Sequence, residues 1–197
     1  KLEVILQSQL DQALPGGFRL TAIGRAHADA GNHREAAEVY RRFIRRTRNL
    51  DRQIEANTRL AQVLIAAGDR SGADQALTQA VRLARRSRGR VGDGGLYYAA
   101  QARFLQAEEL LRQYEEIQIA GTVEGLRQRL ERKSELLRRA AEAFAEVVQL
   151  NVAEWVTAAL YQIGRSYELF AEALRSAPIP EGLTEEEEAA YTEQLSG

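Results

Sequence analysis

A pattern of small residues occurs twice in the chain, with the two copies 37 positions apart. The first copy contains Gly24, Gly31, Ala36 and Tyr40, and the second contains, at the same offsets, Ala61, Gly68, Ala73 and Leu77. A repeat of this length with small residues at fixed offsets is typical of stacked helix-turn-helix units. The first small residue lets one helix approach its partner closely. The second ends that helix in the left-handed conformation, which glycine adopts readily, and the third lies where the two helices cross.

The composition favours helix along almost the whole chain. Prolines occur only at positions 15, 178 and 180, so no proline interrupts a helix between them. The good helix formers Ala, Leu, Glu, Arg and Gln dominate. We therefore predict an all-α fold with helices near residues 1–13, 18–30, 33–47, 52–67, 70–86, 94–120, 123–150 and 152–175. A last helix should begin at Thr184, which has capping-box spacing to Glu187.

The repeated positions resemble the tetratricopeptide repeat (TPR) family. The matching residues are Ile23, Gly24, Gly31, Ala36, Tyr40 and Phe43, followed by Leu60, Ala61, Gly68, Ala73, Leu77 and Ala80. The usual closing proline is absent from both repeats, and His27 replaces the usual tyrosine. Looser matches place Ala102 and Gly164 in the first small position of two further units. The resemblance implies an α-solenoid of antiparallel helix hairpins.

The resemblance predicts one continuous array over residues 1–197. Its expected parts are 1–16 (tail helix of a preceding repeat), 17–50 (repeat), 51–93 (repeat plus loop), 94–150 (elongated hairpin repeat) and 151–197 (a further helix and the start of the next, truncated repeat). The third hairpin must be elongated because the small positions are spaced 37, 41 and then 62 residues apart. If that hairpin folds at Gly121–Thr122, Leu111 faces Lys133, and the Lys133 ammonium is expected to reach water.

Residues that could carry catalysis or bind a metal are few. The glycine-rich stretch 89–95 has neither the preceding strand nor the following Lys-Ser or Lys-Thr of a phosphate-binding loop. The two histidines, His27 and His33, lie six positions apart across a predicted helix end, and the chain has no cysteine. We therefore predict a protein that is not an enzyme, with no catalytic residues, no metal, no cofactor and no small-molecule substrate.

Charge is distributed unevenly along the chain. Residues 1–93 carry a net charge of +7 and residues 94–197 carry −8. Arginines cluster at 41, 42, 45, 46, 48 and 52, and again at 82, 85, 86, 88 and 90. Cations near helix C-termini offset the helix dipole, so we expect solvated helix ends, and nucleic acid is an unlikely partner. An Arg-rich helical nucleic-acid-binding module is the alternative function.

In the TPR family, peptides bind the concave face formed by the first helix of each hairpin. The resemblance therefore implies a groove for a protein or peptide partner, and the arginines at 25, 103 and 165 favour a partner of acidic character. Its expected residues are Thr21, Arg25, Asp29, Thr58, Gln62, Arg103, Gln106, Tyr161, Arg165 and Glu168. The tip of the elongated hairpin should present Ile117, Ile119 and Val123 to a later segment or to a partner. The expected function is a non-catalytic protein-protein interaction scaffold.

The compartment is expected from the second half of the chain. This half looks like long TPR proteins in the cell envelopes of deltaproteobacteria, including gliding-motility and Tol-Pal-linked systems. We therefore expect a bacterial periplasmic or cell-envelope protein, with a cytoplasmic one as the alternative. The chain begins at Lys1 and contains no methionine, which indicates a piece of a longer product. No apolar run approaches the 18 residues of a membrane span.

Overall fold

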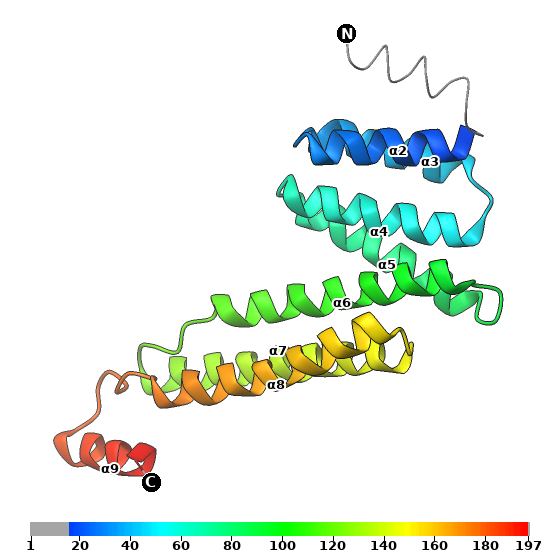
Figure 1. Cartoon of the computed structure of the whole chain (residues 1–197). Helices are drawn as coiled ribbons and strands as arrows, with labels where there is room; N and C mark the ends of the chain where they lie inside the picture. The colour runs from blue at the N-terminus through cyan, green and yellow to red at the C-terminus, as the bar shows by residue number, and fades with distance from the viewer. Residues whose placement is uncertain (1–15, 197) are drawn as a thin grey trace. The chain divides into compact units, whose positions relative to one another are not determined.

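A computed structural model describes residues 16–196, and this part of the chain is built from helices without strands (Figure 1). The helices are α2 (Gly16–Asp29), α3 (His33–Arg46), α4 (Leu50–Ala66), α5 (Arg70–Arg86), α6 (Asp93–Glu116), α7 (Val123–Gln149), α8 (Ala153–Arg175) and α9 (Glu185–Ser196). The all-α prediction is confirmed. The predicted helix at 1–13 lies outside the described residues.

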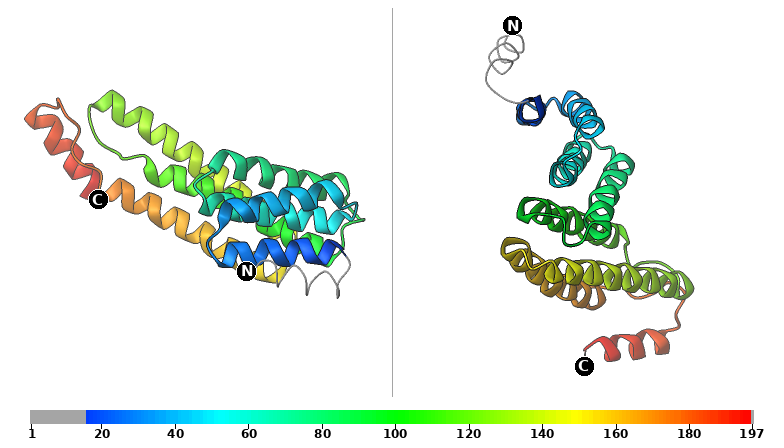
Figure 2. Two further views of the ribbon diagram at one scale, coloured as in Figure 1. Left: turned by 90° about the horizontal axis from the view of Figure 1, so that it is seen from above. Right: turned by 90° about the vertical axis from the view of Figure 1, so that its right-hand side faces the viewer.

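The chain divides into two compact units, and the division falls within α6. Unit 1 ends at Arg103 and unit 2 begins at Phe104. In unit 1, α2 packs on α3, α3 on α4, and α4 on α5, and Figure 2 shows these helices running antiparallel one after another. In unit 2, α7 packs on α8.

The small residues of the repeat act in unit 1 as the sequence predicts. Gly31 and Gly68 end α2 and α4 with φ of +76° and +81°, the left-handed region that side chains disfavour. A Cβ at Gly24 would lie 2.9 Å from Cζ of Tyr40. The Tyr40 ring on α3 therefore occupies the space that a larger residue on α2 would need, and the two helices approach closely.

The glycine-rich connection between α5 and α6 binds a carboxylate from within the chain. The Gly92 N–H donates to both oxygens of Asp51 at the start of α4, at 3.0 and 3.2 Å. A Cβ at Gly92 would lie 2.6 Å from Oδ2 of Asp51, and one at Gly95 would lie 2.5 Å from Oδ1. The glycines are needed because the carboxylate lies against the loop backbone.

The helices α6 and α7 are longer than the helices that precede them. α6 and α7 contain 24 and 27 residues, whereas α2 and α3 contain 14 each and α4 and α5 contain 17 each. The Phe104 ring lies 5.3 Å from the Phe144 ring and 5.2 Å from the Trp155 ring, centroid to centroid. Toward the other end of these helices a second cluster consists of Leu111, Tyr114, Leu136 and Leu137, with Leu110, Ile117, Leu169 and Phe170 packed against it.

The register predicted for the long hairpin is wrong by about one helical turn. Lys133 meets the carbonyl of Tyr114, not Leu111, and its side chain is only 4% exposed, so the ammonium does not reach water. The reason is that α6 ends at Glu116 instead of residue 120. Residues 117–122 form a non-helical connection between α6 and α7. This connection shifts the register relative to a tight turn.

The start of α9 has the capping box that the sequence predicts. The Glu187 N–H donates to the Thr184 hydroxyl at 3.4 Å, and the Glu187 carboxylate accepts from the Thr184 N–H at 2.8 Å. Hydrogen bonds from Thr184 lower the pKa of Glu187 below its usual value, and the bond from the Thr184 backbone N–H has the larger effect. They fix where α9 begins.

Candidate functional site

A polar hollow of unit 1 lies between α2, α3 and α4. Its volume is about 240 Å³, and it is lined by Arg25, Ala28, Asp29, His33, Tyr40, Arg59, Gln62, Val63 and Ala66. Three predicted groove residues, Arg25 and Asp29 of α2 and Gln62 of α4, therefore lie around one cavity, and all three are exposed. Hairpin packing brings them together, because the turn at Gly31 returns the chain along α2.

Arg59 lines this hollow and is held from two directions. Its Nε donates to Glu55 on the preceding turn of α4 at 2.8 Å. Its Nη2 donates to the Tyr98 hydroxyl of α6, and its Cζ lies 5.1 Å from the Tyr98 ring centroid. An arginine fixed by a carboxylate and an aromatic ring is already ordered before any ligand arrives.

The hollow offers hydrogen-bond donors and positive charge. Burial raises the pKa of Tyr40, while the positive charges of Arg59 and Arg25 oppose that shift. The phenol is therefore neutral at physiological pH and keeps its proton. His33 Nδ1 is buried and makes no hydrogen bond within the described structure. A buried polar atom without a partner costs free energy, so a ligand atom that bonds to it would recover that cost.

The other groove residues of unit 1 lie elsewhere. Thr58 is fully buried, and its hydroxyl donates within the fold, to the carbonyls of Ile54 at 3.0 Å and Tyr98 at 3.1 Å. Its assignment to a binding surface is therefore wrong, because its side chain is not available to a partner. Thr21 is 9% exposed, and Arg103 is partly exposed on α6.

The groove residues of unit 2 lie mainly on one exposed face of α8. Tyr161 is 66% exposed, and Arg165 and Glu168 are also exposed. Leu160 and Tyr167 flank them at 55% and 57% exposure. Gln106 is partly exposed on α6. These residues are thus a separate set from those that line the hollow of unit 1.

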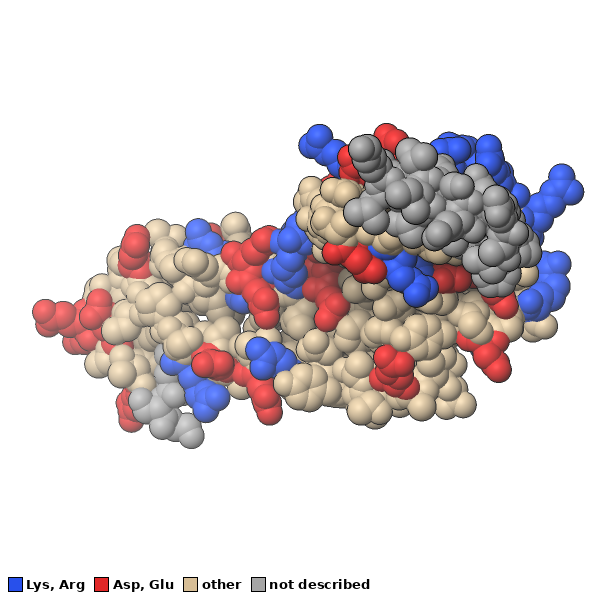
Figure 3. All heavy atoms as spheres, turned by 45° about the horizontal axis from the view of Figure 1, so that its top comes forward, with Lys and Arg blue, Asp and Glu red and all other residues tan. Residues whose placement is uncertain are grey.

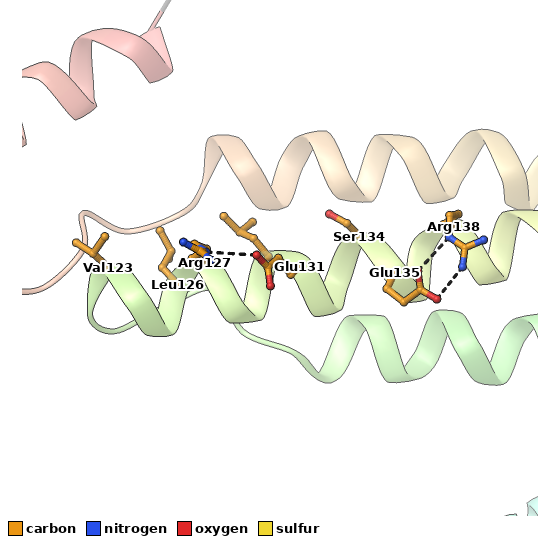
Figure 4. Close-up of a pocket in the computed structure, with 8 residues that line it drawn as sticks. Val123, Leu126, Arg127, Glu131, Ser134, Glu135 and Arg138 are labelled. Atoms are coloured by element: carbon orange, nitrogen blue, oxygen red, sulfur yellow. Dashed lines mark hydrogen bonds and ion pairs between the residues drawn. The ribbon is translucent and has the colours of Figure 1, made fainter.

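Of the three residues predicted for the hairpin tip, two pack into the protein and one is exposed. Ile119 is 8% exposed, and Ile117 packs against the Leu111 cluster. Val123 is 51% exposed and lies at the end of a shallow groove on α7 (Figure 4). The groove has an apolar strip of Val123, Leu126 and Leu130, flanked by the ion pairs Arg127–Glu131 and Arg138–Glu135.

Most of the arginines that cluster in the sequence are exposed. Arg41, Arg42, Arg45 and Arg46 lie on α3, and Arg85 and Arg86 lie in the last turn of α5. On the face shown in Figure 3, basic side chains are concentrated around the N-terminal helices. In residues 16–196, no three His, Cys, Asp or Glu side chains lie close enough together to hold a metal ion.

Sequence reasoning missed Arg59, Tyr98 and His33 as site residues. The spacing of Glu55 and Arg59 is that of an i, i+4 ion pair, and it indicates that Arg59 is oriented along α4. The contact with Tyr98 crosses almost 40 positions of sequence, and no local pattern indicates it. His33 follows the turn at Gly31, so its orientation depends on how the hairpin closes.

Comparison with known proteins finds no relative: no family model matches the chain, and neither does a curated protein or a solved structure. In the described part of the chain no helix is both long enough and apolar enough to cross a membrane.

Proposed function

We propose that the protein is a non-catalytic scaffold of TPR-like hairpins that binds protein partners, and that the hollow of unit 1 binds an acidic side chain or terminal carboxylate of such a partner. The observation that carries the proposal is the convergence of Arg25, Arg59 and His33 on one cavity, with the Nδ1 of His33 buried and without a hydrogen bond in the described structure. A carboxylate only accepts hydrogen bonds, and hydrogen bonds to charged groups are the stronger ones.

The charges around the hollow favour a carboxylate at one particular side of it. Glu55 already neutralises Arg59 along α4, whereas Arg25 extends from α2 and is exposed. The exposed Asp29, one turn further along α2, disfavours a carboxylate at its own end of the cavity. The ligand carboxylate is therefore expected nearest Arg25 and His33.

An NMR titration tests the proposal with three peptides of equal length: an acidic, an uncharged and a basic one. The acidic peptide should shift the resonances of Arg25, His33 and Gln62, and the other two should not. Arg25→Glu should weaken acidic-peptide binding about tenfold, the loss of roughly 1.4 kcal/mol. Arg41→Glu is the matched control, since Arg41 is an exposed arginine of α3 that does not line the hollow.

Two results would contradict the proposal. Equal affinities of the Arg25→Glu and Arg41→Glu variants would exclude the hollow as the binding site. Tight binding of generic DNA or RNA that weakens steeply with salt would favour the Arg-rich nucleic-acid module instead.

The proposed scaffold belongs to a bacterial cell-envelope or motility assembly. The support is the resemblance of the second half of the chain to envelope TPR proteins. Fractionation of the native protein from its own cells should recover it in the periplasmic or envelope fraction. Recovery in the cytoplasmic fraction would contradict the assignment and leave the binding proposal standing.

A further inference from the structure

Lys133 is a buried lysine in the middle of α7. Its side chain is 4% exposed, and among the buried polar side chains of the described residues it alone carries a charge. Its Nζ donates to the Tyr114 carbonyl of α6 at 2.9 Å and lies 3.7 Å from the centroid of the Tyr114 ring. Burying an ammonium group is costly without compensating contacts, so a specific role for these contacts is expected.

The contact lies where α6 ends, although the local sequence does not account for that end. The residues after Glu116 are Ile117, Gln118, Ile119 and Ala120, with no proline, and the next glycine is Gly121. In a continuing helix the Tyr114 carbonyl would accept from the N–H four residues later. Here it accepts from Ile117 at 3.2 Å and from Lys133. A cation at a carbonyl of the last turn also offsets the helix dipole.

The residues released from α6 hold a distant segment of unit 2. Residues 117–122 lie outside any helix, and Ile119 is buried within this stretch. The Gly121 carbonyl accepts from the Glu181 N–H at 3.1 Å, and Thr122 forms a parallel bridge with Glu181. Pro180, next to this bond, is buried. The segment between α8 and α9 is thus hydrogen-bonded to the hairpin where residues 117–122 have left the helix.

We propose that Lys133 is a latch: its amine ends α6 at Glu116, and it thereby keeps residues 117–122 out of the helix for the backbone bond to Glu181 that fixes the segment leading to α9. Removal of the amine should let α6 continue toward Ala120, and a helical Gly121 region cannot present its carbonyl to Glu181 in the same way. The latch therefore couples a side chain in α7 to the attachment of the α8–α9 segment.

The protonation of Lys133 provides a direct readout of this environment. Burial lowers the pKa of Lys133, and the Glu115 carboxylate of α6 opposes that shift. Tyr114, whose ring lies beneath the amine, has its own pKa raised by burial. Looser packing around Lys133 should therefore move its pKa back toward the ordinary value near 10.5.

The first experiment is Lys133→Met, which keeps most of the stem and removes the amine. Amide hydrogen exchange of Glu181 should become at least tenfold faster, while amides of residues 118–120 gain protection. Exchange of the α4 amides in unit 1 should not change. Arg132→Met is the matched control, because it removes an exposed cation from the neighbouring position of α7. Glu181 exchange within twofold of the wild type in a folded Lys133→Met variant would overturn the latch.

The second experiment tests the coupling from the other end and does not require Lys133→Met to fold. Coupling between two sites is reciprocal, so loss of the Glu181 N–H must affect Lys133. Glu181→Pro removes that N–H, and Glu181→Ala keeps it. The chain has two lysines, so labelling with carbon-13 at the lysine ε position gives two resonances to follow with pH. The Lys133 pKa should rise in Glu181→Pro relative to Glu181→Ala, and equal pKa values would overturn the proposal.

Discussion

At the residue scale, two glycines at the same position of the repeat pattern have different surroundings. A Cβ at Gly24 would lie 2.9 Å from Cζ and 3.0 Å from Cε1 of Tyr40, and Tyr40 is only 2% exposed. At Gly164 on α8 a Cβ would meet nothing within 4 Å. The first glycine is required by packing, and the second lowers the stability of a helix without such a reason.

Alanine at these two positions should therefore have opposite effects on the free energy of unfolding. Gly24→Ala should destabilise by roughly 1–3 kcal/mol, since a buried ring must move. Gly164→Ala should stabilise by about 0.5–1 kcal/mol, the difference in helix propensity. The single tryptophan, Trp155, reports on unit 2. In urea titrations, Gly164→Ala should raise the fluorescence midpoint, and Gly24→Ala should lower only the circular-dichroism midpoint. Changes of the same sign would contradict this account.

Individual residues differ in how far the sequence predicts them. Gly31 and Gly68 were predictable, because a left-handed turn leaves few alternatives to glycine. Lys133 and Thr58 were not. Helical periodicity places both on a particular face of a helix, but the partners that bury them, Tyr114 and Tyr98, come from a different helix. Burial of a polar side chain depends on such long-range partners more than on its neighbours in sequence.

At the element scale, the connection between α5 and α6 is a small anion-binding loop whose anion is Asp51. Its glycines suggest a phosphate loop, yet the backbone N–H of Gly92 bonds to a carboxylate of the same chain. Among the described residues, apart from its immediate chain neighbours, a Cβ at Gly92 would meet only atoms of the Asp51 carboxyl within 4 Å. The need for glycine at position 92 thus depends on Asp51.

A double-mutant cycle tests this dependence. Gly92→Ala should destabilise unit 1 by roughly 1–2 kcal/mol in the wild type, because the new methyl group and the carboxylate compete for the same space. Asp51→Ala should cost a similar amount through the lost charge-assisted bond. In the Asp51→Ala background, Gly92→Ala should be nearly neutral, so the two effects are not additive. Asp74→Ala, an exposed acid of α5, is the control. Additive effects would mean that Asp51 does not hold the loop.

The sequence predicts where most helices begin and end, but not where α6 ends. Glycine turns and the Thr184–Glu187 capping box are local signals, so the ends that they mark agree with the structure within a few residues. The end of α6 has no local signal, since the contact from Lys133 lies 19 positions away. The predicted hairpin register then failed with it, because register is counted from the turn.

At the scale of the whole molecule, the continuous helix α6 belongs to both compact units. The unit boundary falls between Arg103 and Phe104, after the first eleven residues of a 24-residue helix. The sequence gives no linker, glycine or proline at this point, so the division could not be predicted. The all-α fold was predictable because helix propensity acts at every residue. The grouping of helices into units depends instead on contacts between helices.

The first turns of α6 should therefore be needed to complete unit 1. Tyr98 accepts a hydrogen bond from the buried Thr58 through its carbonyl at 3.1 Å and one from Arg59 through its hydroxyl. A fragment of residues 1–103 should unfold cooperatively. A fragment of residues 1–92 should be less stable by roughly 2–3 kcal/mol, since each lost hydrogen bond costs about 1 kcal/mol and the cation–π contact of Arg59 is lost as well. Thermal melts followed by circular dichroism measure the difference.

Tyr98→Ala in the 1–103 fragment separates the contribution of Tyr98 from that of the rest of the segment. This variant should lose the contacts with Arg59 but keep the backbone carbonyl of residue 98. Its melting temperature should lie between those of the two fragments. Equal melting temperatures for the 1–92 and 1–103 fragments would show that unit 1 is complete without α6.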